Sequence, residues 1–119
     1  MNKQISDIKD LQKRIGKFVE DRDWKQFHNH KDMAVSLVLE ATEVLEHFQW
    51  KNPDEILQHA KTHKDDLSDE LADVAVYLFE LADNLNIDLK MAVLKKIKKN
   101  SYKYPIEKAK GKHNKYTDL

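Results

Sequence analysis

The sequence predicts an all-α protein, an antiparallel helical bundle of about four main helices. Only two of its 119 residues are glycine and two are proline, whereas 35% are charged. This composition favours long helices with short connections over a β fold. Apolar residues also recur at helical spacing, as Ile8, Leu11, Ile15 and Phe18 do near the start. At this length the bundle is expected to be one domain with a modest core.

Capping residues set the expected bounds of each helix. Ser6 is a typical N-cap, Asn52 stands before a proline and two acids, and Asp88 precedes the last periodic segment. The aromatic stretch 22–28 is expected to be a loop or short turn. Four main helices are predicted, over about residues 6–21, 31–48 (or 31–50), 66–84 and 88–104. A further short helix is predicted to begin at residue 53. We expect residues 1–105 to form the domain. Residues 106–119 lack helical periodicity and are expected to form a C-terminal tail.

Composition also excludes several classes of protein. The chain has no cysteine, so it has neither a disulfide framework nor a thiolate metal site. No apolar run approaches the roughly 20 residues of a membrane span, and the first residues lack a signal-peptide core. A soluble cytoplasmic protein without a membrane partner is the expectation. The net charge of zero argues against a general nucleic-acid binder.

Charge is nevertheless distributed unevenly. Residues 40–83 hold 12 acidic residues and three lysines, whereas residues 84–119 hold three acidic residues and ten lysines. An acidic middle followed by a basic end suggests a metal site and a phosphate-facing helix. The alternative is that most of these lysines only keep a helix face solvated.

Two pairs of carboxylates are the candidate metal ligands. Glu40 with Glu43, and Glu70 with Asp73, are each spaced i, i+3, so each pair projects to one side of its helix. On a helical wheel Glu70 falls inside the apolar arc and Glu40 on its edge, and a carboxylate there is costly to bury without a partner. If the two helices lie antiparallel, the four acids meet. An all-oxygen site of this kind suits Mg²⁺. A single such pair would more often be a solvated surface feature.

The fourth predicted helix offers groups that suit a phosphate. Lys96, Asn100 and Tyr104 are spaced four residues apart and therefore share a face, which presents a cation, an amide and a phenol.

Taken together, these motifs resemble the MazG-type, all-α nucleoside triphosphate pyrophosphatases, and within them the dCTP pyrophosphatase-like branch. The resemblance runs through Arg22-Asp23-Trp24-x-Gln26-Phe27-His28, Glu40-x-x-Glu43-x-x-Glu46-x-Phe48-Gln49-Trp50 and Asp69-Glu70-Leu71-x-Asp73-Val74-x-x-Tyr77-Leu78. It continues through Asp88-Leu89-x-x-Ala92-Val93, Lys96, Asn100, Tyr104-Pro105 and Lys115-Tyr116-Thr117-Asp118-Leu119. A lone ExxE is worthless as a signature, whereas this ordered set is specific.

The resemblance implies hydrolysis of a deoxynucleoside triphosphate to the monophosphate and pyrophosphate, a house-cleaning reaction of the nucleotide pool. The expected substrate is dCTP or a 5-modified dCTP. Glu40, Glu43, Glu70 and Asp73 would be catalytic as the Mg²⁺ ligands, with Mn²⁺ as a substitute. Lys96, Asn100 and Tyr104 would contact phosphate or sugar. The family commonly forms homo-oligomers, dimers or tetramers, in which neighbouring subunits complete each base pocket.

Aromatic residues are the candidates for binding the base and the sugar. Trp24 and Trp50, with Phe27 or His28 nearby, would hold the base, and Tyr77 would pack against the sugar. Each of these aromatic residues could instead be ordinary core or interface. Two positions near the first acidic pair, Leu39 and Thr42, depart from glycines that relatives tend to have, and Ile15 replaces a polar residue of some relatives. These departures bear on base preference.

One alternative is the same reaction with a different base preference (dATP, dUTP or broad specificity). Two other classes of protein are also considered, a non-catalytic helical adaptor and a di-iron bundle. A di-iron bundle needs Glu-x-x-His on two helices. Here Glu43 and His47 are four residues apart, and residues 66–84 hold no histidine. The six histidines show no zinc-site spacing, so all but His28 are expected to be structural or solvated.

Overall fold

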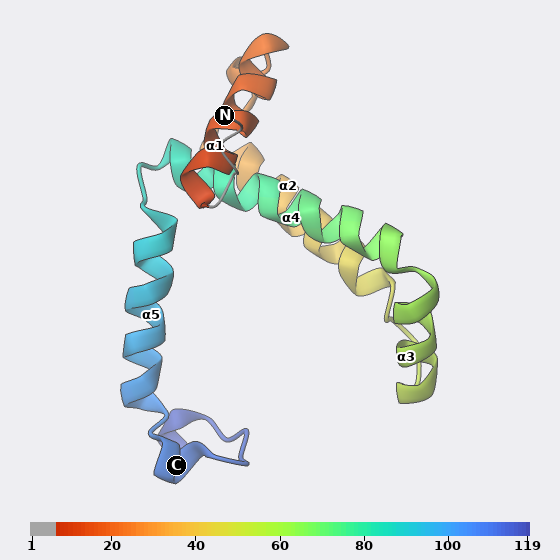
Figure 1. Ribbon diagram of the computed structural model, residues 1–119, viewed down its shortest axis with the longest axis vertical. Helices are drawn as coiled ribbons and strands as arrows, with labels where there is room; N and C mark the ends of the chain where they lie inside the picture. The colour runs from red at the N-terminus through yellow and green to blue at the C-terminus, as the bar shows by residue number, and fades with distance from the viewer. Residues whose placement is uncertain (1–6) are drawn as a thin grey trace, which may run out of the picture. The chain divides into compact units, whose positions relative to one another are not determined.

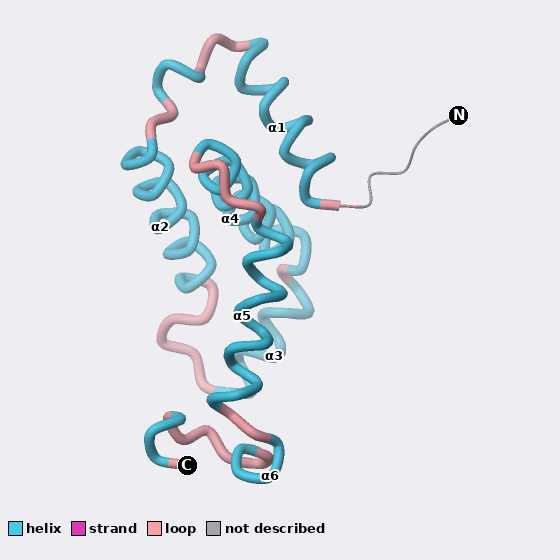
Figure 2. The backbone as a smooth tube through the Cα atoms, turned by 90° about the vertical axis from the view of Figure 1, so that its left-hand side faces the viewer, coloured by secondary structure: helices cyan, strands magenta, loops and turns pink. Residues whose placement is uncertain are grey.

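The computed structural model describes residues 7–119, which form helices joined by short connections and contain no strand (Figure 2). The prediction of an all-α fold is confirmed. The elements are α1 (Ile8–Asp21), η1 (Lys25–Phe27), α2 (His30–Glu46), α3 (Pro53–Thr62), α4 (Lys64–Asn84), α5 (Leu89–Lys103), α6 (Ile106–Ala109) and η2 (Tyr116–Asp118). Contacts divide the chain into one unit that ends at Asn86 and a second over residues 87–119.

The centre of the first unit is an antiparallel pair of helices. Figure 1 shows α2 and α4 side by side with the chain running in opposite directions. α1 packs against α4, where the side-chain amide of Gln12 donates a 2.8 Å hydrogen bond to the backbone oxygen of Phe79. α3 contacts α4 at its other end. This arrangement brings the two acidic segments of the sequence onto neighbouring helices.

Side-chain caps begin four of these helices, largely where the sequence predicts. Asn52 and Glu55 form a complete capping box at the start of α3, with Pro53 in the first position. Asp88 caps α5 by accepting from the backbone N–H of Met91 at 3.1 Å. The cap of α1 is Asp7, which accepts from the backbone N–H of Asp10 at 2.9 Å. The predicted cap, Ser6, lies outside the described residues.

Two helix bounds differ from the prediction. α2 ends at Glu46, and residues 47–50 are turns, because the chain reverses there and Trp50 adopts a left-handed conformation with φ 65°. α4 begins at Lys64, two residues early, because His63 both ends α3 and precedes α4.

The second unit is formed by α5 and a C-terminal segment that folds back on the end of this helix. Residues 106–119, expected to be a C-terminal tail without periodicity, carry the short helices α6 and η2. The ring of Tyr116 lies edge-on to that of Tyr104, with centroids 6.2 Å apart, and the Lys103 ammonium lies over the Tyr116 ring at 4.9 Å. These contacts join the C-terminal segment to the end of α5.

Little of the described chain is buried within one copy. The buried hydrophobic side chains are those of Val19, Met33, Leu67 and Ala82, and no large side chain is fully buried. No helix in residues 7–119 is long and apolar enough to cross a membrane.

Candidate functional site

The four candidate carboxylates lie on the antiparallel pair, Glu40 and Glu43 on α2 and Glu70 and Asp73 on α4. Glu40 and Glu70 are half-buried, whereas Glu43 and Asp73 are exposed. The helical wheel predicts this difference in burial, because Glu40 and Glu70 lie nearest the apolar stripes and therefore turn toward the neighbouring helix.

The carboxyl of Glu40 is perturbed by its surroundings. Burial raises its pKa above the ordinary value, and so do a hydrogen bond with Glu43 and the negative charges of Glu43, Asp73 and Glu70. Its Oε2 is buried without a hydrogen-bond partner. The other three acids therefore lie close enough to Glu40 to act on its carboxyl, and this repulsion favours a cation beside it.

The donor set suits a hard divalent cation by its chemistry, since it consists of carboxylate oxygens. One buried oxygen of Glu40 also has its bonding capacity unused. The side chains do not all converge on one point, however. Within residues 7–119 no three His, Asp or Glu side chains are already placed to hold an ion.

Glu70 makes its close contact with a histidine. Its Oε2 is buried and has no partner in hydrogen-bond geometry, but it forms an ion-pair contact with Nε2 of His47. The side chains of Glu70 and His47 are 25% and 14% exposed. No sequence pattern pointed to this pair, because His47 follows the last residue of α2 and meets Glu70 only when α4 packs against it.

Tyr77 lies one helical turn beyond Asp73 and faces the same acidic region. Burial raises the pKa of its phenol, as do the charges of Glu40, Asp73 and Glu80, while a hydrogen bond with Ser36 acts in the opposite direction. The phenol is thus held between α2 and α4 beside Glu40 and Asp73.

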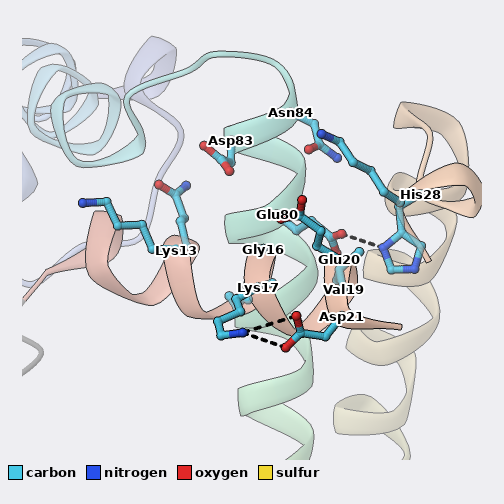
Figure 3. Close-up of a pocket in the computed structure, with 13 residues that line it drawn as sticks. Lys13, Gly16, Lys17, Val19, Glu20, Asp21, His28, Glu80, Asp83 and Asn84 are labelled. Atoms are coloured by element: carbon cyan, nitrogen blue, oxygen red, sulfur yellow. Dashed lines mark hydrogen bonds and ion pairs between the residues drawn. The ribbon is translucent and has the colours of Figure 1, made fainter. Parts of the chain in front are cut away.

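Trp24 and His28 flank η1, which lies just before the N-terminus of α2. Trp24 stands edge-on to Phe18 at 5.8 Å between centroids and lies 6.4 Å from the His28 ring. Figure 3 shows His28 pointing at Glu80, and their Nδ1 and Oε1 atoms are 2.5 Å apart. The carboxylate of Glu80 is buried. This pair fixes the loop of Trp24 to α4.

A cavity of about 540 Å³ lies between α1, the His28–Glu80 pair and the end of α4 (Figure 3). Its lining is mixed, with polar groups from Lys13, Lys17, Asp83 and Asn84 around the apolar side chain of Ile15. A volume of this size is in the range of small-molecule sites.

Trp50 lies at the opposite end of α2 and is 92% exposed, with the backbone at φ 65°. A bulky residue in the left-handed region is strained, and such outliers concentrate at functional positions. Since the 17 residues of α2 separate them, Trp24 and Trp50 of one chain stand roughly 25 Å or more apart and do not meet.

Lys96 and Asn100 lie on α5 and Tyr104 follows its last residue, so all three belong to the second unit. All are exposed. The backbone N–H of Tyr104 caps the helix through a 2.8 Å hydrogen bond to the oxygen of Asn100. The first unit holds the carboxylates, Tyr77 and both tryptophans.

The amino-acid sequence is similar to that of a known protein family and of several characterised proteins. A family model described as the MazG-like family matches residues 35–119. The chain is 38% identical over 114 residues to dCTP pyrophosphatase 1 of Mus musculus, covering 94% of this chain and 67% of that protein. Identity to dCTP pyrophosphatase 1 of Homo sapiens is 36% over 114 residues, with the same coverage.

A solved structure is similar in its fold as well. The crystal structure of a pyrophosphatase from Archaeoglobus fulgidus superposes with a TM-score of 0.80 at 34% identity, covering 88% of this chain and 98% of that one.

Proposed function

The chain belongs to the MazG-like family, and on that premise we propose that it hydrolyses a deoxynucleoside triphosphate to the monophosphate and pyrophosphate. The preferred substrate in this proposal is dCTP or a 5-modified dCTP, and dCTP is the substrate named in its mammalian relatives. By analogy with the family, the reaction would remove unwanted nucleotides from the DNA precursor pool.

One observation carries the proposal, namely the electrostatic coupling of four carboxylates on α2 and α4. Burial and three neighbouring acids raise the pKa of Glu40, and its Oε2 has no partner. Such an arrangement is unfavourable in a purely structural bundle. It becomes useful when a cation and an anionic substrate meet there.

Glu40, Glu43, Glu70 and Asp73 would hold Mg²⁺, with Mn²⁺ as a substitute. When bound, a divalent cation neutralises phosphate charge and makes coordinated water a better nucleophile. The carboxylates of this chain bring the charge that fixes the cation. Glu43 and Asp73, the exposed members, lie on the side from which a triphosphate can approach.

Lys96, Asn100 and Tyr104 are the proposed contacts for phosphate and sugar. They carry a cation, an amide and a phenol, which are donors for phosphate oxygens. Tyr77, held between Glu40 and Ser36, is positioned to pack against the sugar next to the acids.

The base would be bound between tryptophans of different subunits. Trp24 and Trp50 of one chain lie at opposite ends of α2, so a base held by both requires a second copy. His28, fixed by Glu80, would complete the pocket on the Trp24 side. The exposed indole of Trp50 would then be covered by the neighbouring subunit.

A homo-oligomer, a dimer or a tetramer, is therefore part of the proposal. The large exposed hydrophobic side chains of the first unit include Val38, Leu39 and Leu45 on α2 and Leu71 on α4, each more than half exposed. A domain of this size with so few buried side chains needs further burial to be stable. A second copy of the same chain supplies it by symmetry.

The test is release of pyrophosphate from each of the eight common nucleoside triphosphates, with Mg²⁺, with Mn²⁺ and with EDTA. We expect metal-dependent turnover with dCTP preferred, and loss of at least a hundredfold in Glu40→Gln and Asp73→Asn with helicity and assembly unchanged. Glu107→Gln, an exposed carboxylate outside both helices, is the matched control.

The outcomes separate the alternatives. Preference for dATP or dUTP, or broad use of all triphosphates, would change only the base assignment. Turnover close to wild type in both carboxylate variants would refute the metal ligands. If no triphosphate is cleaved with either metal, the chain is a helical adaptor that has kept the fold.

A further inference from the structure

Three of the six histidines of the chain meet at the corner where α2, α3 and α4 adjoin. His47 follows the last residue of α2, His59 lies on α3, and His63 joins α3 to α4. We call these residues the histidine cluster. Their spacing in the sequence, 12 and four residues, gives no sign of the contact, because the turn after α2 and the capped start of α3 bring them together.

The cluster is connected directly to Glu70. Nε2 of His47 pairs with Oε2 of Glu70, while Nδ1 of the same ring lies 2.6 Å from Nε2 of His59. Both nitrogens of His47 are therefore engaged, one by the carboxylate and one by the second imidazole. The ring of His59 is also stacked on that of His63, with centroids 4.0 Å apart and an angle of 10°.

The chemistry of the groups fixes the donor only where His47 meets Glu70. An ionised carboxylate can only accept, so Nε2 of His47 carries the proton in this contact, in which the two groups meet as an ion pair and not in hydrogen-bond geometry. Between Nδ1 of His47 and Nε2 of His59 one ring donates and the other accepts, and the tautomers of the two rings decide which.

The surroundings of His59 favour the neutral form of its own ring. Burial lowers the pKa of His59, and so do the positive charges of His63, Lys51 and His47, while Asp66 acts in the opposite direction. The cluster is also not arranged as a metal site of its own. Two of its rings share a hydrogen bond and two are stacked in parallel, and no three such side chains in the described residues are placed around an ion.

We propose that His47 is a positioning residue for Glu70, and that His59 locks the ring of His47 in the orientation that donates to the carboxylate. The role rests on the proposed function, in which Glu70 is a metal ligand. Because one oxygen of Glu70 is bound to His47, the carboxylate is held in one rotamer and its other oxygen remains for the cation. Ligands oriented in this way bind metal more tightly than freely rotating ones.

The measurement is Mn²⁺ binding to the nucleotide-free protein by calorimetry, which does not depend on turnover. In His47→Leu, which removes the donor at nearly constant size, we expect the Kd for Mn²⁺ to rise about tenfold, in the range known for such supporting groups. His47→Gln restores an N–H near the Nε2 position and should recover most of the affinity. His59→Ala should weaken binding by about threefold, because His47 stays but its ring is free to turn.

His63→Ala is the matched control, since it removes a stacked imidazole of the same cluster that makes no hydrogen bond to His47 or Glu70. Its Kd should equal that of the wild type. If His47→Leu does not fold, the comparison of His59→Ala with His63→Ala decides. Equal Kd values in these two variants would overturn the role.

A second readout needs no metal at all. Long-range ¹⁵N correlation spectra of the folded protein distinguish the two imidazole tautomers, and we expect His47 to carry its proton on Nε2. A proton on Nδ1, or an unchanged Mn²⁺ Kd in His47→Leu, would overturn the role of His47 and leave the proposed function intact. A wild-type protein that binds no Mn²⁺ and cleaves no triphosphate would overturn both.

Discussion

At the scale of single residues, Glu40 shows how a site opposes the stability of its own fold. Its carboxyl is half-buried, one oxygen has no partner, and Glu43, Glu70 and Asp73 add like charge. A side chain selected for packing alone would not be charged here. The cost is acceptable where the charge is needed to bind a cation.

The raised pKa of Glu40 predicts how stability changes with pH. The folded chain binds this proton more tightly than the unfolded chain, so the contribution of Glu40 to stability is full below the ordinary carboxyl pKa and is lost as the pH rises through the raised value. Glu40→Gln has no proton to lose. In EDTA at about pH 7.5 its Tm should therefore exceed that of the wild type by a few degrees, and the gap should narrow toward about pH 5.

Saturating Mg²⁺ should reverse this order, since binding stabilises the wild type and not the variant. Thermal unfolding followed by circular dichroism measures both effects. Glu107→Gln should have the same Tm as the wild type at both pH values. A Glu40→Gln gap of equal size at both pH values would contradict the electrostatic explanation.

At the scale of elements, the short helix α3 depends on its N-terminal cap. Its 10 residues are few for a stable helix, and it carries His59 against the end of α2. Asn52 accepts from the backbone N–H of Glu55 at 2.9 Å, and the Glu55 carboxylate accepts from the backbone N–H of Asn52 at 3.2 Å. The capping box therefore determines where the chain leaves the turn after α2 and how α3 meets α4.

Asn52→Ala removes half of this box, and we expect it to lower the free energy of unfolding by about 1 kcal/mol. Asn52→Asp keeps an acceptor at the same place and should stay near the wild type. Urea unfolding at a fixed protein concentration measures the difference. Equal losses in the two variants would show that α3 is held by its packing and not by the cap.

At the scale of the whole molecule, the distribution of apolar surface argues for self-association. Only four hydrophobic side chains in the described residues are buried, whereas Leu45 on α2 is 62% exposed and Leu71 on α4 is 55% exposed. Exposed apolar surface of this extent on neighbouring helices is typical of an interface. The two tryptophans at opposite ends of α2 lead to the same conclusion.

Leu45→Glu should disrupt the assembly, because it places a charge where the proposed interface is apolar. In light scattering after size exclusion, we expect the wild type to have the mass of a dimer or tetramer of the 14.0 kDa chain, and the variant a smaller one. Gln58→Glu adds the same charge on the exposed surface of α3 and should leave the mass unchanged. A wild-type mass of one chain would refute the oligomer.

Local sequence determined the elements and their chemistry. Helical periodicity and caps such as Asn52 and Asp88 act within a few residues, so all five helices expected before Pro105 form near their predicted places. The i, i+3 spacing of Glu40 with Glu43 and Glu70 with Asp73 likewise fixed which side of each helix would be acidic. Even the more open position of Glu43 and Asp73 follows from the helical period.

Contacts between distant segments were decided only by the tertiary structure. The left-handed Trp50, the fold-back of Tyr116 on Tyr104, and the pairs His28–Glu80 and His47–Glu70 join residues from different elements or depend on how the chain turns between them. No periodicity encodes which turn of one helix meets which turn of another, because side-chain packing sets that register. The sequence by itself thus determined the carboxylates, and only the packing of α2, α3 and α4 determined which neighbours hold them.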